Sequence, residues 1–232
     1  MRPMRPGAIA AFVALLAPVM ALAAATAWSL APALRPLGEL RGIALVVAMV
    51  VSVYGYAIGA HRLLLLYAPL REGPIYPGSH HEFCYQVYSL AYLFLFNPLI
   101  RCTAIPIPLM RLVYLALGAR LGTNTFSAGI LFDPTFVTIG ANTLVGESAM
   151  LVPHVIEGSE CAHWRIVIGD NVTIGAHTIV LAGVVIGDNV IIAANSVVAK
   201  RTCIHSGEMW GGSPARRLIG RSLAQPRAAT RL

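Results

Sequence analysis

An aliphatic residue recurs at every sixth position through the second half of the chain, which is neither a helical period nor a simple strand period. Glycine or alanine usually follows it, and a small residue lets the backbone bend sharply. A short strand and a tight turn therefore form one side of a triangular coil, whose inward side chains stack on those of the next coil. The pattern predicts a mainly β fold, a parallel β-helix of about four coils. The unbroken run consists of Ile168, Ile174, Val180, Ile186, Ile192 and Val198.

The first coil keeps this phase but contains two unusual inward residues. Leu121 and Ile139 lie eighteen residues apart, which corresponds to three sides of the coil. Ser127 and Asp133 occupy the inward positions between them and are poor inward residues, because burying a polar group costs free energy. Asparagine and aspartate recur at the expected turns, where they tolerate positive φ or bond to the backbone. These turn residues are Asn142, Asp170, Asn171, Asp188, Asn189 and Asn195.

Residues 118–218 resemble the hexapeptide-repeat acyltransferases. The resemblance is sharpest from Ile168 to Val190, and it extends to Ser196–Val198 and to the closing Trp210–Arg216. It implies that the β-helix is left-handed, that the protein is a homotrimer with active sites between subunits, and that acetyl-CoA is the acyl donor. The reaction it implies is transfer of an acyl group from the thioester to a hydroxyl or an amine.

The repeat slips once, and the interruption contains the candidate catalytic residues. From Leu151 to Ile168 is seventeen residues rather than eighteen, and the segment between them lacks the repeat. Such interruptions are loops on one face of a solenoid, and these loops tend to be functional. The resemblance implies a general-base histidine on this loop, and His154 matches its place. The ionisable candidates on the loop are His154, Glu157, Glu160 and His163.

The chemistry of His154 suits acyl transfer. Imidazole has an unperturbed pKa of about 6.5, so it can accept the proton of an attacking hydroxyl or amine near neutral pH. A carboxylate on the other ring nitrogen would fix the tautomer and stabilise the imidazolium. Glu157 is the predicted carboxylate and Glu160 the second choice, while His163 is the second candidate for the base. The alternative for each is an ordinary loop residue without a catalytic role.

Candidate acetyl-CoA contacts lie in the last coils. The resemblance implies that the pantetheine arm runs along a groove between adjacent β-helices, with the nucleotide near the carboxy-terminal coils. An alternative for the closing turn is purely structural, with Trp210 covering the open end of the core. Small residues allow close backbone approach, and cations pair with phosphates. The candidates are Ala193, Ala194, Lys200, Arg201 and Arg216.

Two long uncharged runs precede the repeat region. Residues 7–34 carry no charge and, as a helix, exceed the roughly 30 Å of hydrocarbon that a span must cross. Residues 42–60 form a second run of the same character. The two runs predict two transmembrane helices joined by a turn at 36–41. A cleaved secretory signal is the alternative for the first run, because two arginines precede it and small residues lie near its end.

Two shorter apolar segments follow. Ser79 and Glu82 have the spacing of a capping box, which predicts a helix that starts here and ends at Asn97-Pro98. Its apolar part is marginal in length for a membrane span. Pro108 is expected to open a short helix that extends to Leu117. We expect both helices either to lie along the membrane surface or to pack under the β-helix.

These observations divide the chain into four expected parts and place it in a bacterial-type inner membrane. Charged residues make up 12% of the chain, against about 25% in soluble domains. Arginines near the amino terminus favour a cytoplasmic start, and two crossings would return the β-helix to the cytoplasmic side. The parts are a membrane anchor (1–72), interfacial or linker helices (73–118), the acyltransferase β-helix (119–203) and a carboxy-terminal cap with a basic tail (204–232).

The predicted function is a membrane-anchored O- or N-acyltransferase. The acetyl group would pass from acetyl-CoA to a membrane-associated acceptor such as a lipid-linked sugar, a polysaccharide unit or an amphiphilic peptide. The alternative is a non-catalytic β-helix scaffold in a membrane biosynthetic complex. No metal is expected, because the histidines lack the close pairing of the β-helical zinc enzymes, and no feature of the sequence indicates nucleic-acid binding.

Overall fold

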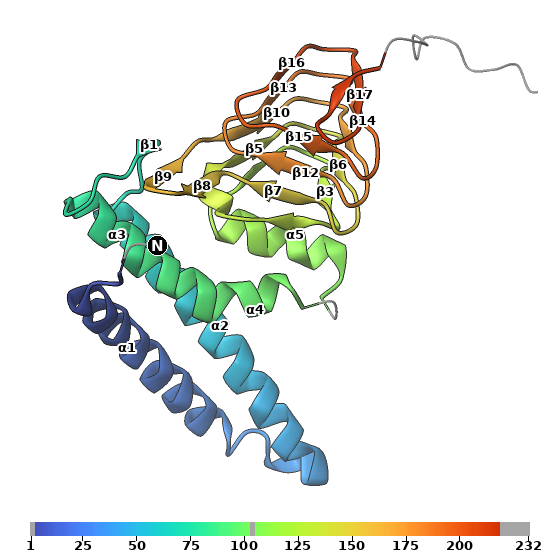
Figure 1. Ribbon diagram of the computed structural model, residues 1–232. Coiled ribbons are helices and arrows are strands. Elements are labelled where there is room, and N and C mark those ends of the chain that lie inside the picture. The colour runs from blue at the N-terminus through green and yellow to red at the C-terminus, as the bar shows by residue number, and fades with distance from the viewer. Residues whose placement is uncertain (1–2, 103–104, 219–232) are drawn as a thin grey trace, which may run out of the picture. The chain divides into compact units, whose positions relative to one another are not determined.

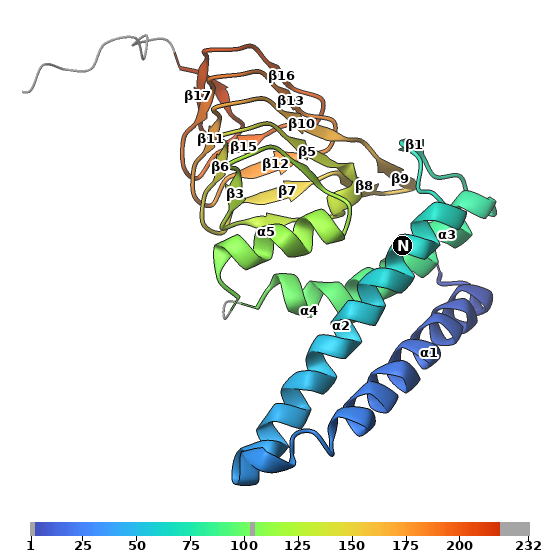
Figure 2. The same ribbon diagram turned by 180° about the vertical axis from the view of Figure 1, so that it is seen from behind.

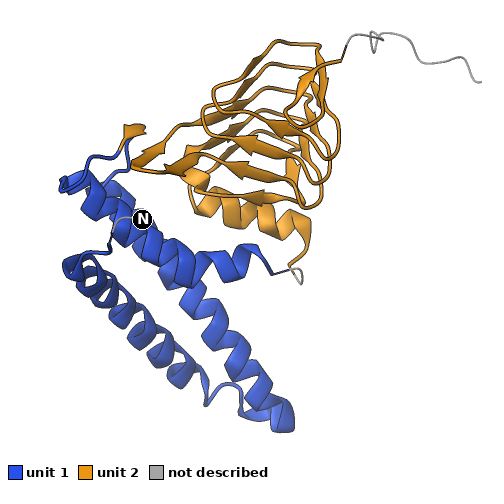
Figure 3. Cartoon of the chain, viewed as in Figure 1, with its two compact units in different colours: residues 1–71, 75–102 blue, residues 72–74, 103–232 orange. Residues whose placement is uncertain are grey.

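The computed structural model describes residues 3–102 and 105–218, and the chain forms two compact units. Residues 1–71 and 75–102 form the first unit, and residues 72–74 and 103–232 form the second (Figure 3). The expected basic tail includes residues 219–232, which lie outside the described part of the chain. The four-part division expected from the sequence stays a prediction.

The first unit consists of apolar helices (Figure 1). Helix α1 spans Pro6–Leu30 and helix α2 spans Arg41–Tyr67, with a short 3₁₀ segment, Arg35–Leu40, between them. The hydroxyl groups of Thr26 and Tyr56 join α1 and α2 by a hydrogen bond of 2.8 Å. By length and composition, both segments are able to cross a membrane, in agreement with the two predicted spans.

The third helical segment extends further than the sequence predicted. It consists of α3 (His80–Ala91), a π-helical segment (Tyr92–Phe96) and α4 (Asn97–Ile100), and its 21 residues also have the length and composition of a span. The predicted end at Asn97-Pro98 is wrong. Pro98 lies in the first turn of α4, where a residue without a backbone N–H is tolerated.

The amino end of α3 has the predicted capping box. The hydroxyl of Ser79 accepts a hydrogen bond from the backbone N–H of Glu82 at 3.0 Å. The carboxylate of Glu82 in turn accepts the backbone N–H of Gly78 at 2.8 Å. Backbone donors at a helix start have no partner within the helix, so these bonds fix where α3 begins.

The second unit is built on three sheets that form the sides of a parallel β-helix (Figures 1 and 2). The four-stranded sheet contains β4 (Ile130–Leu131), β7 (Met150–Val152), β12 (Ile179–Leu181) and β15 (Val197–Val198). The five-stranded sheet contains β2 (Arg120–Leu121), β5 (Val137–Ile139), β10 (Ile166–Ile168), β13 (Val185–Ile186) and β16 (Cys203–Ile204). The six-stranded sheet contains β3 (Phe126–Ser127), β6 (Leu144–Val145), β11 (Thr173–Ile174), β14 (Ile191–Ile192), β17 (Met209–Gly211) and β18 (Arg216–Arg217), the last of which is antiparallel to β17.

The predicted inward positions form the core of the β-helix. Leu121, Ile139 and Ile168 are register partners on three successive strands of the five-stranded sheet. Every sixth residue from Ile168 to Val198 is at most 2% exposed. Each fully buried aliphatic side chain contributes about 1.5–3 kcal/mol relative to an exposed one, so the repeated residue is what stabilises the stacked coils.

The turns adopt the backbone conformation that the sequence predicted. A small residue is required where coils approach closely, since a Cβ on Gly175 would lie 2.4 Å from the backbone nitrogen of Ala194. Asparagine occupies left-handed turn positions, with φ between 52° and 57°, at Asn142, Asn171, Asn189 and Asn195.

Helix α5 (Ile107–Ala116) packs against the first coil of the β-helix, and it begins one residue before the predicted Pro108 (Figure 2). The guanidinium group of Arg111, a residue of α5, binds carbonyl oxygens of that coil. Arg111 donates from Nε to the Thr125 carbonyl at 3.0 Å and from Nη2 to the Gly122 carbonyl at 2.8 Å. Arg111 is the one charged residue between Ile107 and Ala116, and its charge is directed to the β-helix.

The phenol of Tyr114 ties α5 to the same coil. Its hydroxyl donates to the Gly129 carbonyl at 3.0 Å and accepts the backbone N–H of Leu131 at 3.2 Å. Tyr114 is 1% exposed, and burial raises its pKa to about 12, so the phenol stays neutral and remains a donor at physiological pH.

Replacing Tyr114 with phenylalanine is expected to destabilise the protein by about 1–3 kcal/mol, because a buried carbonyl and a buried N–H each lose a partner. Thermal unfolding in detergent, followed by tryptophan fluorescence, measures the change. Tyr76→Phe is the matched control, since Tyr76 is 68% exposed. Equal melting temperatures for the two variants would show that the Tyr114 hydroxyl does not hold α5 in place.

Candidate active site

The interruption in the repeat folds as a β-hairpin. Strands β8 (His154–Glu157) and β9 (Glu160–His163) leave the β-helix between β7 and β10 and pair antiparallel. Strand β1 (Gly73–Pro74) pairs antiparallel with β9 on its other side. The predicted loop on one face of the solenoid is therefore confirmed, as Figure 1 shows.

The hairpin emerges from one corner of the β-helix. At this corner the chain passes from the four-stranded to the five-stranded sheet, once in each coil. We call these stacked turns the hairpin corner; they comprise residues 132–136, 153–165, 182–184 and 199–202. Residues that are far apart in the sequence thereby lie in adjacent coils.

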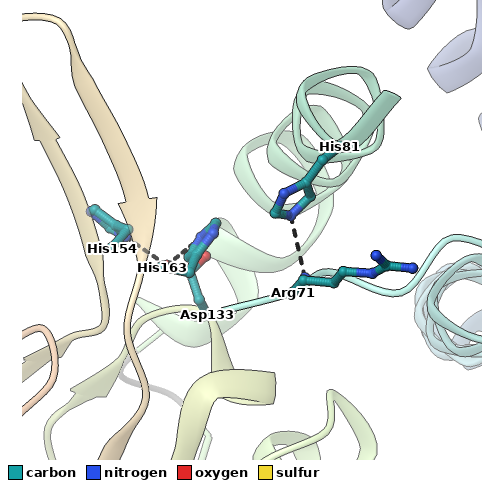
Figure 4. Close-up of polar contacts among 5 residues, drawn as sticks. All are labelled: Arg71, His81, Asp133, His154 and His163. Carbon is teal, nitrogen blue, oxygen red and sulfur yellow. Dashed lines mark hydrogen bonds and ion pairs between the residues drawn. The ribbon is translucent and has the colours of Figure 1, made fainter. Parts of the chain in front are cut away.

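Asp133 occupies the hairpin corner one coil before the hairpin. Its backbone is left-handed, with φ of 41°, and the residue is 5% exposed. One carboxylate oxygen, Oδ2, lies 2.6 Å from Nδ1 of His154 and 3.9 Å from Nε2 of His163 (Figure 4). The inward residue that was unusual in the repeat is thus a buried carboxylate between two imidazoles.

His154 combines an anchored nitrogen with partial exposure. Nδ1 donates to Asp133, which leaves Nε2 as the nitrogen that can accept a proton, and the side chain is 29% exposed. The ring meets Phe132 edge-on, with centroids 5.8 Å apart. Burial lowers the pKa of His154, but the hydrogen bond and the charge of Asp133 outweigh it, so the net pKa lies above the ordinary value.

His163 lies behind this pair rather than at the surface. It is 0% exposed and stacks on Phe136 with ring centroids 4.6 Å apart. Arg165 lies over the same Phe136 ring at 5.9 Å and donates to the Thr135 carbonyl at 3.1 Å and to the Glu72 carboxylate at 2.7 Å. A fully buried ring cannot meet a substrate directly, so His163 is suited to hold Asp133 in position.

Glu157 does not occupy the position that the sequence predicted for it. It forms an ion pair with Lys200, while Asp133 is the carboxylate on the imidazole of His154. The reason is the strand geometry: residues three apart on β8 point to opposite faces, so His154 and Glu157 diverge. Glu160 is the register partner of Glu157 near the hairpin tip, also away from the imidazole.

Lys200 and Arg201, predicted to bind phosphates, both contact the hairpin segment. Lys200 pairs with Glu157 near the hairpin tip. The Arg201 guanidinium lies over the ring of Trp164, 4.8 Å from its centroid. The side of the hairpin that faces the coils is apolar, and Trp164 packs there against Val155, Ala162 and Ala182. The later turns 182–184 and 199–202 therefore both help to hold the hairpin that carries His154.

The remaining predicted cofactor residues lie elsewhere. Ala193 and Ala194 follow β14, at the corner between the six-stranded and four-stranded sheets, and Arg216 is an exposed residue of β18. The five predicted residues thus belong to more than one corner. Within residues 3–102 and 105–218, no group of three or more His, Cys, Asp or Glu side chains is arranged to hold a metal ion.

Comparison with known proteins shows what part of this chain is similar to. Residues 165–200 match the family described as "Bacterial transferase hexapeptide (six repeats)". The chain is also similar to a curated protein of Bacillus subtilis (strain 168) named "Putative acetyltransferase YvoF", with 33% identity over 94 residues. That match covers 40% of this chain and 54% of the relative, so the chain spans about half the length of the curated protein. The resemblance to hexapeptide-repeat acyltransferases is confirmed.

Two solved structures are similar to somewhat less than half of this chain. The hexapeptide-repeat acetyltransferase VCA0836 from Vibrio cholerae is 32% identical, with 47% of this chain and 64% of that chain covered and a TM-score of 0.42. A galactoside acetyltransferase in complex with coenzyme A is 31% identical, with 44% and 54% covered and a TM-score of 0.38.

Proposed function

We propose that this protein is a membrane-anchored acyltransferase that moves an acetyl group from acetyl-CoA to a hydroxyl or amine of a membrane-associated acceptor. The observation that carries the proposal is the His154–Asp133 pair: one ring nitrogen is bound to a buried carboxylate at 2.6 Å, and the ring is partly exposed. The transferase description of residues 165–200 and the name of the Bacillus relative support the same reaction class.

The pair suits both proton steps of the reaction. As the acceptor attacks the thioester carbonyl carbon, Nε2 of His154 takes the proton of the acceptor, and Asp133 stabilises the imidazolium that forms. The carbon–sulfur bond then breaks, and the same proton passes to the departing thiolate of coenzyme A. Because Asp133 raises the pKa of His154, the imidazole is a stronger base than an unpaired histidine.

The membrane part of the proposal rests on the helices of the first unit. Three segments have the length and composition of spans. We assign the crossings to α1 and α2, because α3 carries Glu82 and Gln86, and such side chains are costly inside a bilayer. With a cytoplasmic amino terminus, two crossings would return the β-helix to the cytoplasmic side of an inner membrane, where CoA thioesters are found. A carboxy-terminal tag that reacts with an impermeant reagent in intact cells would contradict this placement.

A homotrimer is part of the proposal as well, together with a left-handed coil. One face of the β-helix presents apolar side chains to its surroundings, and packing of three copies would bury them. On the six-stranded sheet, the equivalent outward register positions carry Phe126, Leu144, Thr173, Ile191 and Met209, of which four are apolar.

The reaction is tested with the purified full-length protein in nanodiscs, acetyl-CoA and a panel of acceptors that includes lipid-linked sugars, polysaccharide units and amphiphilic peptides. Cys102 and Cys203 are exposed and would react with thiol reagents, so coenzyme A is followed by mass spectrometry. Acetylated product and stoichiometric coenzyme A are expected with at least one acceptor. Calorimetry that detects no acetyl-CoA binding, with no product from any acceptor, would support the non-catalytic scaffold instead.

A further inference from the structure

The side of α5 that points away from the β-helix is apolar. Met110 and Tyr114 are buried on the inner side of α5. The opposite side carries Leu109 and Leu112, which are 53% and 58% exposed, and we call it the α5 outer face. A helix on the surface of a soluble domain normally has polar and charged residues there. A helix that is apolar all round is instead buried in protein or in a membrane.

No polar side chain of α5 compensates for this. Arg111 is bound through its guanidinium group to the carbonyl oxygens of Gly122 and Thr125 in the first coil. Tyr114 uses its hydroxyl within the same coil. The polar atoms of α5 side chains thus serve the β-helix, and the outer face is left with aliphatic groups alone.

The charged residues that flank α5 in the sequence are of one sign. Residues 83–132 contain no aspartate or glutamate. Arg101 precedes α5, Arg120 follows it, and both are exposed. An apolar helix face between basic residues is the combination that binds an anionic bilayer surface, where the side chains enter the interface and the guanidinium groups meet lipid phosphates.

The position of α5 in the chain fits the same surface. Its first residue, Ile107, lies seven residues after Ile100, the end of a segment with the length and composition of a membrane span. In the sequence, α5 thus follows a long apolar helical segment directly, and it is itself a short apolar helix.

We propose that the α5 outer face lies in the interface of a bilayer that contains anionic lipids. Because the inner side of α5 covers the first coil, the β-helix then approaches the membrane with that coil, and its last coils are the furthest from the lipid. This inference concerns membrane contact alone, so it can fail while the proposed acetyl transfer holds, and the reverse.

Spin-label accessibility in the full-length protein tests the proposal. The background is a variant with Cys102→Ser and Cys203→Ser, reconstituted in vesicles of phosphatidylcholine and phosphatidylglycerol. One label is attached at Leu112→Cys on the α5 outer face. The matched control is Val185→Cys on β13, an aliphatic residue of comparable exposure at 43%. Relaxation by oxygen, which concentrates in lipid, is compared with relaxation by a nickel chelate, which stays in water.

The label at Leu112 is expected to be relaxed more strongly by oxygen than by the nickel chelate, and the label at Val185 more strongly by the nickel chelate. If the label at Leu112 behaves like the one at Val185, the face is in water and the proposal is overturned. If the label at Leu112 is shielded from both reagents, protein covers the face, and the proposal is overturned as well.

Discussion

Replacing His154 with alanine is expected to lower kcat by about 10²–10⁴-fold, the usual contribution of a general base. The imidazole is the only group on β8 that combines partial exposure with a buried carboxylate partner, among the residues that the structure describes. Acetyl-CoA affinity is expected to change little, because the loss is confined to proton transfer. Single-turnover measurements with saturating donor separate the two quantities.

The control for this variant is His177→Asn. His177 is an exposed turn residue with φ of 57°, a conformation that asparagine adopts readily, and it lies within the regular repeat. Its turnover should match that of the parent protein. If His154→Ala also keeps the parental turnover on an active acceptor while remaining folded, His154 is not the base.

Replacing Asp133 with asparagine is expected to lower kcat/KM by about 10²-fold, because the isosteric amide keeps the volume but no longer holds the imidazole in its orientation and charge state. Glu157→Gln should leave kcat/KM close to the parental value, since Glu157 pairs with Lys200 and not with the imidazole. The comparison separates the carboxylate seen in the structure from the one expected from the sequence. A large loss in Glu157→Gln beside an active Asp133→Asn would reverse the assignment.

The pH profile gives this prediction a second measurement. In the parent protein, kcat/KM should fall as the pH decreases through the raised pKa of His154, because the protonated ring cannot accept a proton. In Asp133→Asn the negative charge that helps to raise this pKa is lost, while burial, which lowers it, remains. The fall should therefore move to lower pH. A merely structural role of Asp133 would lower the whole profile without moving it.

The base candidate could be found from the sequence, but its partner could not. His154 lies in the break of the repeat, which marks a departure from the solenoid. The sequence points to Glu157 because of its His-x-x-Glu spacing from His154, whereas Asp133 lies 21 residues earlier and becomes adjacent only when the coils stack. A signal was nevertheless present: Asp133 is a charged residue at an inward position of the repeat, and such a residue requires a buried partner.

The fold followed from the sequence more closely than the site did. The six-residue period predicted the buried aliphatic positions, the turns and the place of the hairpin. It could do so because each coil repeats the same requirement for a buried aliphatic side chain and a small residue after it. The end of the third helical segment was missed at Pro98, which tolerates a first-turn position as well as it ends a helix. The roles of Lys200 and Arg201 were not readable, since an exposed cation can pair with a phosphate, a carboxylate or an aromatic ring.

The stacking of turns at the hairpin corner links the proposed catalytic pair to the end of the solenoid. Asp133 belongs to the first complete turn above α5, and His154 belongs to the next. Solenoids unravel from their terminal repeats, where each coil has a neighbour on one side only. If the first coil unfolded locally, the Asp133 carboxylate would separate from the His154 ring while the later coils stayed folded. The bonds of Arg111 and Tyr114 to the first coil therefore stabilise the proposed site from a distance, because they delay the separation of Asp133 from His154.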